Sequence, residues 1–168
     1  MQLPDAEAAY NTLVTKIRAE RKADWVLVGI RTGGAWVADR LHYDLAISKP
    51  LGVLSASFYR DDFDKIGLHV QVKPSDIPFD VEGAHILLVD DVLHTGRTVR
   101  AAVNELFDYG RPASISLAVL VDRGDRELPI VAQYWGVEFA LSGGQMLELR
   151  RGTQGKFSFH LYHKDLPE

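Results

Sequence analysis

The sequence predicts an α/β fold in which a central, mostly parallel sheet is flanked by helices. Two observations carry this prediction. Short, continuous apolar runs alternate along the chain with segments whose apolar residues recur at helical spacing. Continuous apolar runs are typical of strands that are covered on both faces, as they are in parallel sheets. The length of 168 residues fits one domain that spans 1–168.

The first third of the chain alternates helix and strand. Residues 5–21 place apolar side chains at helical spacing, and the run 25–30 (Trp-Val-Leu-Val-Gly-Ile) predicts the first buried strand. Thr32-Gly33-Gly34 interrupts the pattern, residues 35–45 return to helical spacing, and residues 51–58 predict a second strand. This alternation is what a parallel sheet requires, because a helix must carry the chain back between strands.

Residues 59–80 differ from the segments on either side. They show no sustained periodicity and contain several charged residues together with Gly67, Pro74 and Pro78. Long irregular stretches are uncommon in small domains and are usually functional. We therefore expect a flexible lid loop at 59–80.

The middle of the chain returns to the alternating pattern. Residues 85–89 predict the third buried strand, residues 96–109 predict a helix that Gly110 closes, and residues 114–121 predict a fourth strand. Because ligands bind at the carboxyl ends of strands in such sheets, we look for the site in the residues that follow each strand.

The last part of the chain is more irregular. Residues 122–129 form a charged turn, and residues 130–162 predict two or three short strands with alternating polarity. Gly143-Gly144 and residues 152–155 mark the turns between them.

Composition excludes several classes of protein. There is no cysteine, so disulfides, thiolate catalysis and cysteine metal sites are excluded. The 19 Lys and Arg against 23 Asp and Glu give a net charge of −4, which argues against nucleic-acid binding through bulk charge. No apolar run approaches the ~20 residues that span a bilayer, and the amino terminus lacks the features of a secretory signal. We expect a cytoplasmic protein without a membrane partner.

The strongest functional pattern directly follows the third predicted strand. Two adjacent carboxylates, Asp90 and Asp91, precede a Thr-Gly turn and a helix start, so backbone N–H groups, the hydroxyls of Thr95 and Thr98 and the positive end of the helix can together hold a phosphate. The carboxylates are better suited to accept hydrogen bonds from the paired hydroxyls of a sugar. The pattern therefore predicts a ribose 5-phosphate site. The alternative is a purely structural strand end, with Thr95 as an ordinary helix cap.

A second pattern follows the first strand. A Gly-Gly pair at 33–34 can adopt backbone conformations that other residues cannot, so that N–H groups approach an anion closely, and Arg31 can add a forked positive charge. The alternative is a plain turn between a strand and a helix.

The residues 86–98 resemble the phosphoribosyl diphosphate (PRPP) motif of the type I phosphoribosyltransferases. The flanking residues indicate a narrower family: residues 110–113, 117–124 (which include Asp122-Arg123-Gly124) and 126–130 are similar to the bifunctional pyrimidine operon attenuator/uracil phosphoribosyltransferase family. Residues 28–32 and 59–62 also fit that family, and the similarity runs from about Trp25 to Pro129 and more loosely to the end. The resemblance implies the type I fold, with a small hood at 122–133 and a C-terminal antiparallel hairpin.

The resemblance also implies roles for individual residues. Asp90 and Asp91 would hold the ribose hydroxyls, and Arg60 in the lid would reach the pyrophosphate. The residues that would bind PRPP or nucleotide are Arg31, Thr32, Gly33, Gly34, Asp90, Asp91, Val92, Leu93, His94, Thr95, Gly96, Arg97, Thr98 and Arg123. The lid would close through Tyr59, Arg60, Asp61 and Asp62.

The implied reaction is uracil + PRPP → UMP + pyrophosphate, with Mg²⁺ as cofactor. Such a site must position the base and stabilise the positive charge on the sugar and the negative charge on the leaving group. Acidic residues beside the ribose, and Arg and backbone N–H groups beside pyrophosphate, suit that task. We expect no direct protein ligand to Mg²⁺, which substrate oxygens would hold, with Asp90 and Asp91 acting at most through water. The resemblance also implies a homo-oligomer, a dimer or larger.

Two alternatives stay open. In the first, the protein is an RNA-binding attenuator that uses the site as a nucleotide sensor. Support for it is thin, because residues 1–25 carry no net charge and Asp125 stands where the family usually has histidine, although Arg150-Arg151, Lys156 and His160 could form a small basic strip. In the second, it is a purine phosphoribosyltransferase. His94 weakens that assignment, since purine enzymes commonly carry aspartate at this position.

Overall fold

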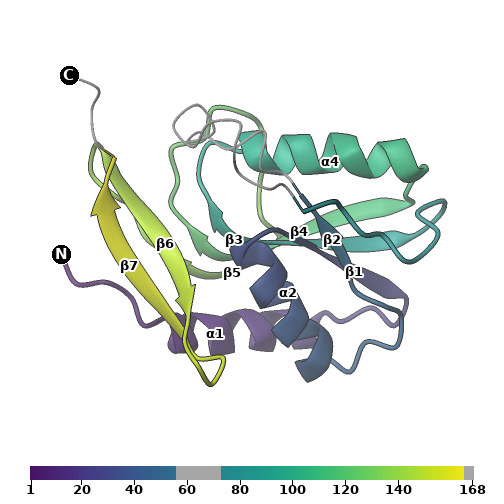
Figure 1. Cartoon of the computed structure of the whole chain (residues 1–168), viewed down its shortest axis with the longest axis horizontal. Coiled ribbons are helices and arrows are strands. Elements are labelled where there is room, and N and C mark those ends of the chain that lie inside the picture. Colours follow the sequence, from purple (N-terminus) through teal and green to yellow (C-terminus); the bar gives the residue numbers. More distant parts are fainter. Residues whose placement is uncertain (56–72, 165–168) are drawn as a thin grey trace.

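The structure is a computed structural model that describes residues 1–55 and 73–164. Its centre is a sheet of five parallel strands in the order β2-β1-β3-β4-β5 (Figure 1). The strands are β1 (Trp25–Ile30), β2 (Gly52–Leu54), β3 (His85–Leu93), β4 (Ser114–Asp122) and β5 (Tyr134–Glu138). The predicted central parallel sheet is confirmed.

Helices cover both faces of this sheet. Helices α1 (Ala6–Ala19) and α2 (Gly33–Asp44) lie on one face, and α4 (Arg97–Tyr109) lies on the other (Figure 1). Because side chains alternate along a strand, the fully buried Leu87 packs with α1 and α2 while its neighbour Leu88 packs with α4. The continuous apolar runs in the sequence reflect this two-sided burial.

A separate antiparallel hairpin completes the fold. Its strands are β6 (Gln145–Arg151) and β7 (Phe157–His163), and it lies beside α1 in Figure 1. The ring of Phe157 packs edge-on against Tyr10 of α1 with centroids 5.8 Å apart, and Glu7 accepts a hydrogen bond from the Phe157 backbone N–H at 3.1 Å. The hairpin is thereby joined to the main core, and the predicted C-terminal hairpin is confirmed.

Strand β3 is longer than predicted, and this places the acidic pair differently. The prediction ended the strand at Val89, but β3 continues to Leu93 because β4 still pairs with it, for example Asp90 with Val119. Pairing with β1 stops at Gly29 opposite Val89. Asp90 and Asp91 therefore stand not in a loop but on an extension of β3 that, among the described strands, pairs with β4 and not with β1.

Two other elements differ from the predictions at their ends. Helix α2 begins at Gly33, two residues before the predicted start, because the glycines that suggested a turn form its first residues. The predicted strand at 51–58 is described only to residue 55, and within that part β2 ends at Leu54. No helix in the described ranges is long and apolar enough to cross a bilayer.

The segment 73–80 returns to the sheet beside β2. Val53 and Asp76 exchange two backbone hydrogen bonds of 2.8 Å, and the Ser55 N–H donates to Ser75 Oγ at 2.8 Å. The rest of the predicted lid, 59–72, lies outside the described residues. The same holds for the four lid residues Tyr59, Arg60, Asp61 and Asp62.

Candidate active site

A small cavity of about 40 Å³ lies where β3 leads into α4. It is lined by Asp90, Val92, Leu93, His94, Thr95, Gly96, Thr98 and Val99. All of these residues except Val99 are ones that the sequence analysis assigns to the PRPP motif. The structure thus brings most of the predicted motif around one cavity at the carboxyl end of the sheet, the edge at which ligands bind in such folds.

The turn before α4 presents backbone N–H groups. Gly96 adopts φ 94°, a left-handed conformation that favours glycine, and the Thr95 hydroxyl accepts a hydrogen bond from the Arg97 N–H at 3.2 Å. Within the described part of the chain, no protein acceptor is bonded to the N–H groups of Thr95, Gly96 and Thr98. These amides, at the positive end of α4, can hold an anion.

The two carboxylates are held by the backbone of the strand that carries them. Asp90 is 4% exposed, and its Oδ1 accepts a hydrogen bond from the Asp91 N–H at 2.9 Å. Asp91 is half-buried, and its Oδ1 accepts from the Val92 N–H at the same distance. Both acids therefore sit in fixed positions on a strand, beside the turn that can hold an anion.

The glycine pair at the start of α2 contacts this acidic pair. A Cβ on Gly33 would stand 2.1 Å from Asp91 Oδ2, and a Cβ on Gly34 would stand 2.9 Å from Asp90 Oδ1. The sequence analysis expected unusual backbone conformations here, but neither glycine has a positive φ. Their role is to leave room for close approach, so that the loop before α2 meets the acidic strand.

The other residues of that loop join β1 to its neighbours. The Arg31 backbone N–H donates to Leu54 O at 2.9 Å, and its Nη2 donates to Pro74 O at 3.1 Å. Thr32 precedes α2, and the peptide bond between Arg31 and Thr32 is cis. Arg31 therefore links the loop after β1 to the end of β2 and to Pro74.

Seven predicted binding residues do not line the small cavity: residues 31–34, Asp91, Arg97 and Arg123. Two of them, Arg97 and Arg123, are held by other parts of the protein. Arg97 points to the surface, where its Nε pairs with Glu127 Oε2 at 2.7 Å. Arg123 is buried against the hairpin, where its Nη2 donates to Gln145 O at 3.2 Å and its Nη1 donates to Met146 Sδ at 3.6 Å. Their assignment to nucleotide binding stays a prediction.

The sequence analysis assigned no role to Arg126, although it makes several polar contacts in the turn after β4. Its Nη2 pairs with Asp122 Oδ2 at 2.6 Å, and its Nη1 donates to His94 O at 2.9 Å. Burial alone would raise the pKa of Asp122, but bonds from Arg126 and the Gly124 N–H hold that pKa below its ordinary value. The only signal in the sequence was alternating charge, which is also typical of a solvated turn.

The neighbouring Asp125 adopts φ 55°, in the left-handed region. Aspartate and histidine are both enriched among non-glycine residues in that region, and Gly124 beside it has φ 74°. Replacing the histidine that the resembled family carries therefore suits the backbone here, and the change is one of charge on an exposed turn.

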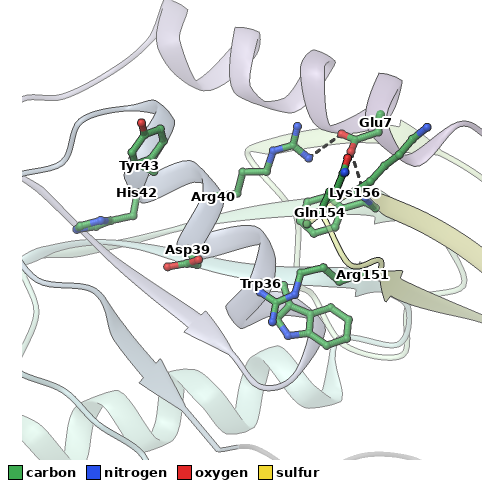
Figure 2. A pocket seen from close by; sticks show the side chains of 11 residues that line it. Glu7, Trp36, Asp39, Arg40, His42, Tyr43, Arg151, Gln154 and Lys156 are labelled. Atoms are coloured by element: carbon green, nitrogen blue, oxygen red, sulfur yellow. Dashed lines mark hydrogen bonds and ion pairs between the residues drawn. The ribbon is translucent and has the colours of Figure 1, made fainter.

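A larger cavity of about 690 Å³ lies away from this site, between α1, α2 and the hairpin (Figure 2). Arg40 pairs there with Glu7 at 2.6 Å, and the Arg151 guanidinium lies 4.9 Å from the centre of the Trp36 ring. Lys156 lines the same cavity. It holds several cationic side chains together with an aromatic face.

The predicted basic strip on the hairpin is divided. Arg151 stands opposite the buried Phe157 in the strand register. Arg150 lies on the other face of the hairpin, where its Nε forms an ion pair with Glu148 Oε2 at 2.9 Å. His160 stands opposite Glu148. Alternation along the strands therefore separates residues that are neighbours in the sequence, and the strip is not continuous.

Comparison with known proteins follows the same lines. Residues 2–143 match the phosphoribosyl transferase domain family. The chain is 51% identical to the bifunctional protein PyrR of Ralstonia nicotianae over 92% of each chain. It is 58% identical to that of Nitrosococcus oceani, covering 79% of this chain and 76% of the relative. The chain belongs to the bifunctional protein PyrR family of phosphoribosyltransferases. The predicted family is confirmed.

Solved structures share the phosphoribosyltransferase fold with this PyrR-family chain. A purine phosphoribosyltransferase from Pyrococcus horikoshii Ot3 has a TM-score of 0.59 at 26% identity, covering 80% of this chain and 85% of its own. A hypoxanthine-guanine phosphoribosyltransferase from Bacillus anthracis has a TM-score of 0.64 at 20% identity, covering 83% of both chains. The type I fold expected for this PyrR-family member is confirmed.

Proposed function

We propose that this protein is a uracil phosphoribosyltransferase that forms UMP and pyrophosphate from uracil and PRPP. One observation carries the proposal: the acidic pair and the amides of the turn before α4 lie together at the end of β3, and Gly33 and Gly34 bring the second loop into contact with that pair. This arrangement suits a ligand that carries a phosphate, a sugar diol and a second anionic group.

The chemistry asked of these residues is electrostatic. Displacement of pyrophosphate at C1 of the sugar develops positive charge on the ring and negative charge on the leaving group. Asp90 and Asp91 would accept hydrogen bonds from the ribose hydroxyls and stabilise the positive ring, while the amides of the turn before α4 would fix the 5-phosphate. Arg31 and the N-terminus of α2 would bind the departing pyrophosphate.

Mg²⁺ fits this arrangement as a partner of the substrate. Carboxylate oxygens are ligands that Mg²⁺ accepts, and the ion usually retains several waters and substrate oxygens. No group of three or more acidic or histidine side chains suited to a metal occurs in the described ranges. Substrate oxygens would hold the ion, with Asp90 and Asp91 acting at most through water, and its chemistry would be to neutralise pyrophosphate.

A steady-state assay of the purified protein tests the proposal. PRPP and Mg²⁺ are supplied with uracil, orotate, hypoxanthine or guanine in turn, and formation of nucleotide and pyrophosphate is measured. We expect turnover with uracil and its loss when Mg²⁺ is chelated. Turnover with a purine alone would overturn the proposal in favour of a purine phosphoribosyltransferase, an activity that the name of the Pyrococcus horikoshii Ot3 relative carries.

RNA binding is the second candidate function. The relatives are named bifunctional proteins, which supports an activity beside the first. The cavity in Figure 2 combines Arg40, Arg151 and Lys156 with the ring of Trp36, and single-stranded nucleic acids bind where cationic and aromatic side chains meet. The acidic side chains of Glu7 and Asp39 line the same cavity and would repel RNA phosphates.

This second function makes a separate prediction. Binding to a pyrimidine-operon leader RNA should be weak and should fall steeply with salt, and Arg151→Ala should weaken it further while leaving uracil turnover unchanged. Affinity is measured by fluorescence anisotropy over a range of salt concentrations. Nanomolar affinity at physiological salt would make RNA binding the leading function, and absence of any salt-dependent binding would remove it.

A further inference from the structure

The guanidinium of Arg126 joins the turn before α4 to the segment that follows β4. Nη1 donates to His94 O at 2.9 Å and to Gly124 O at 3.3 Å, Nε donates to Ile130 O at 2.9 Å, and Nη2 pairs with Asp122. All three guanidinium nitrogens are thus engaged. The Asp122 carboxylate, whose pKa is lowered, keeps its charge in this pair.

Backbone hydrogen bonds join the same two segments. The Arg123 N–H donates to Leu93 O at 2.9 Å, and the N–H groups of Glu127 and Leu128 donate to Thr95 O at 3.0 and 3.2 Å. Contact is close at the turn itself, because a Cβ on Gly96 would stand 3.0 Å from the Ile130 side chain. The carbonyl side of residues 93–95 is therefore covered by residues 123–130.

This contact determines where the amides of the turn point. In a planar trans peptide, the C=O and the following N–H point in opposite directions. The peptide bonds after His94 and Thr95 are trans. Because the His94 carbonyl points to Arg126 and the Thr95 carbonyl points to residues 127–128, the N–H groups of Thr95 and Gly96 point away from that segment. The small cavity lies on that side, and no described residue of 122–130 lines it.

We propose that Arg126 is a positioning residue that orients the phosphate-binding amides of Thr95 and Gly96. It never touches the ligand. Its Nη1 donates a hydrogen bond to the His94 carbonyl on the side away from the small cavity. This bond fixes the plane of the peptide that presents the Thr95 N–H to a phosphate. The inference rests on the proposed function, in that the small cavity is taken as the seat of the 5-phosphate.

Arginine suits this task better than lysine. Its planar fork of five donors can reach several carbonyls and one carboxylate at fixed angles, whereas a lysine ammonium is a single point charge on a flexible chain. An Arg126→Lys variant should keep one or two of the contacts, and Arg126→Met should keep none at similar length. The two variants therefore form a graded series.

Ribose 5-phosphate is the probe that tests the inference. It is titrated into ¹⁵N-labelled full-length protein, and the amide resonances of Thr95 and Gly96 are followed. Relative to wild type, we expect Arg126→Met to raise the Kd by about tenfold, with intermediate weakening in Arg126→Lys. In Arg126→Met the Thr95 and Gly96 resonances should respond only at correspondingly higher concentrations of ribose 5-phosphate. The Kd for magnesium pyrophosphate should stay within about twofold, because that anion is assigned to the loop before α2.

Glu127→Gln is the matched control. It breaks the exposed pair with Arg97 in the same turn but leaves the carbonyl contacts of Arg126 in place, so both affinities should be those of wild type. Unchanged ribose 5-phosphate binding in Arg126→Met would overturn the inference. Equal loss of both ligands in Arg126→Met and in Arg126→Lys would also overturn it, because Arg126 would then support the protein as a whole and not the phosphate-binding amides in particular.

Wild-type controls separate this inference from the proposed function. If wild type binds ribose 5-phosphate through the Thr95 and Gly96 amides but turns over no uracil, the proposed function fails and the role of Arg126 stands. If these amides do not respond in wild type, the inference fails even where uracil is turned over.

Discussion

Gly33 lies against Asp91 so closely that a Cβ on Gly33 would stand 2.1 Å from the Asp91 carboxylate oxygen Oδ2. The loop that leads into α2 and the acidic end of β3 thus touch without a side chain between them. The start of α2 and the end of β3, which are far apart in the sequence, are held at a fixed separation, and the separation depends on the absence of one carbon atom.

Gly33→Ala should therefore damage the site more than the fold. The new methyl group would displace the Asp91 carboxylate, which is only half-buried, and alanine is otherwise favoured in a helix, so the unfolding free energy should change by less than about 2 kcal/mol. We expect uracil turnover to fall by at least about tenfold. Gly143→Ala is the control, because a Cβ on Gly143 meets nothing within 4 Å. Equal activity in the two variants would contradict this role of Gly33.

Asp91→Asn tests the acidic pair directly. The substitution removes one charged acceptor beside the ribose but preserves the shape of a side chain that is only half-buried. The fold should be intact by circular dichroism and thermal unfolding, and kcat should fall sharply, by about a hundredfold or more. Wild-type stability together with full activity would refute the assignment of Asp91.

The pair between Asp122 and Arg126 predicts a pH dependence of stability. Because the pKa of Asp122 is lowered in the folded state, its contribution is present above the unfolded value of about 3.9 and is lost as the pH falls through the folded value. Between about pH 5 and pH 2, wild type should lose more unfolding free energy than Asp122→Asn. Chemical denaturation at several pH values measures this, and parallel curves for the two proteins would count against the pair.

Tyr10 predicts the opposite dependence at alkaline pH. Burial raises its pKa, and the hydrogen bond from its hydroxyl to Asp44 Oδ2, 2.7 Å long, raises it further. The unfolded chain releases this proton above about pH 10 while the folded chain keeps it, so stability should fall from that pH upward. Tyr10→Phe should cost about 1 kcal/mol at pH 7 and should flatten the alkaline slope. An unchanged slope would show that another group causes it.

The sequence predicted the interior of the sheet better than its functional edge. β1 was predicted at its observed bounds because Trp25–Ile30 is apolar throughout and buried on both faces. β3 was ended too early because Asp90 and Asp91 break the apolar pattern, whereas pairing with β4 continues past them. Hydrophobic periodicity indicates which residues are buried in the core. Residues that bind a ligand must be polar even where they continue a strand, so they interrupt that periodicity.

Close approach and polar clamps left weaker traces in the sequence. Gly33 and Gly34 indicate a turn, but a single sequence does not show that a carboxylate will lie against them. Arg126 was one of several alternating charges, and only the folded chain brings His94 O within its reach. Contacts between segments that are distant in the sequence could not be predicted from the sequence alone.

Hydrogen bonds anchor the described residues that precede and follow the segment 56–72. Val53 and Asp76 are bonded to each other, and Pro74 accepts from Arg31. A substitution that displaces Pro74 should therefore be transmitted through Arg31 to the residues that lead from β1 into α2.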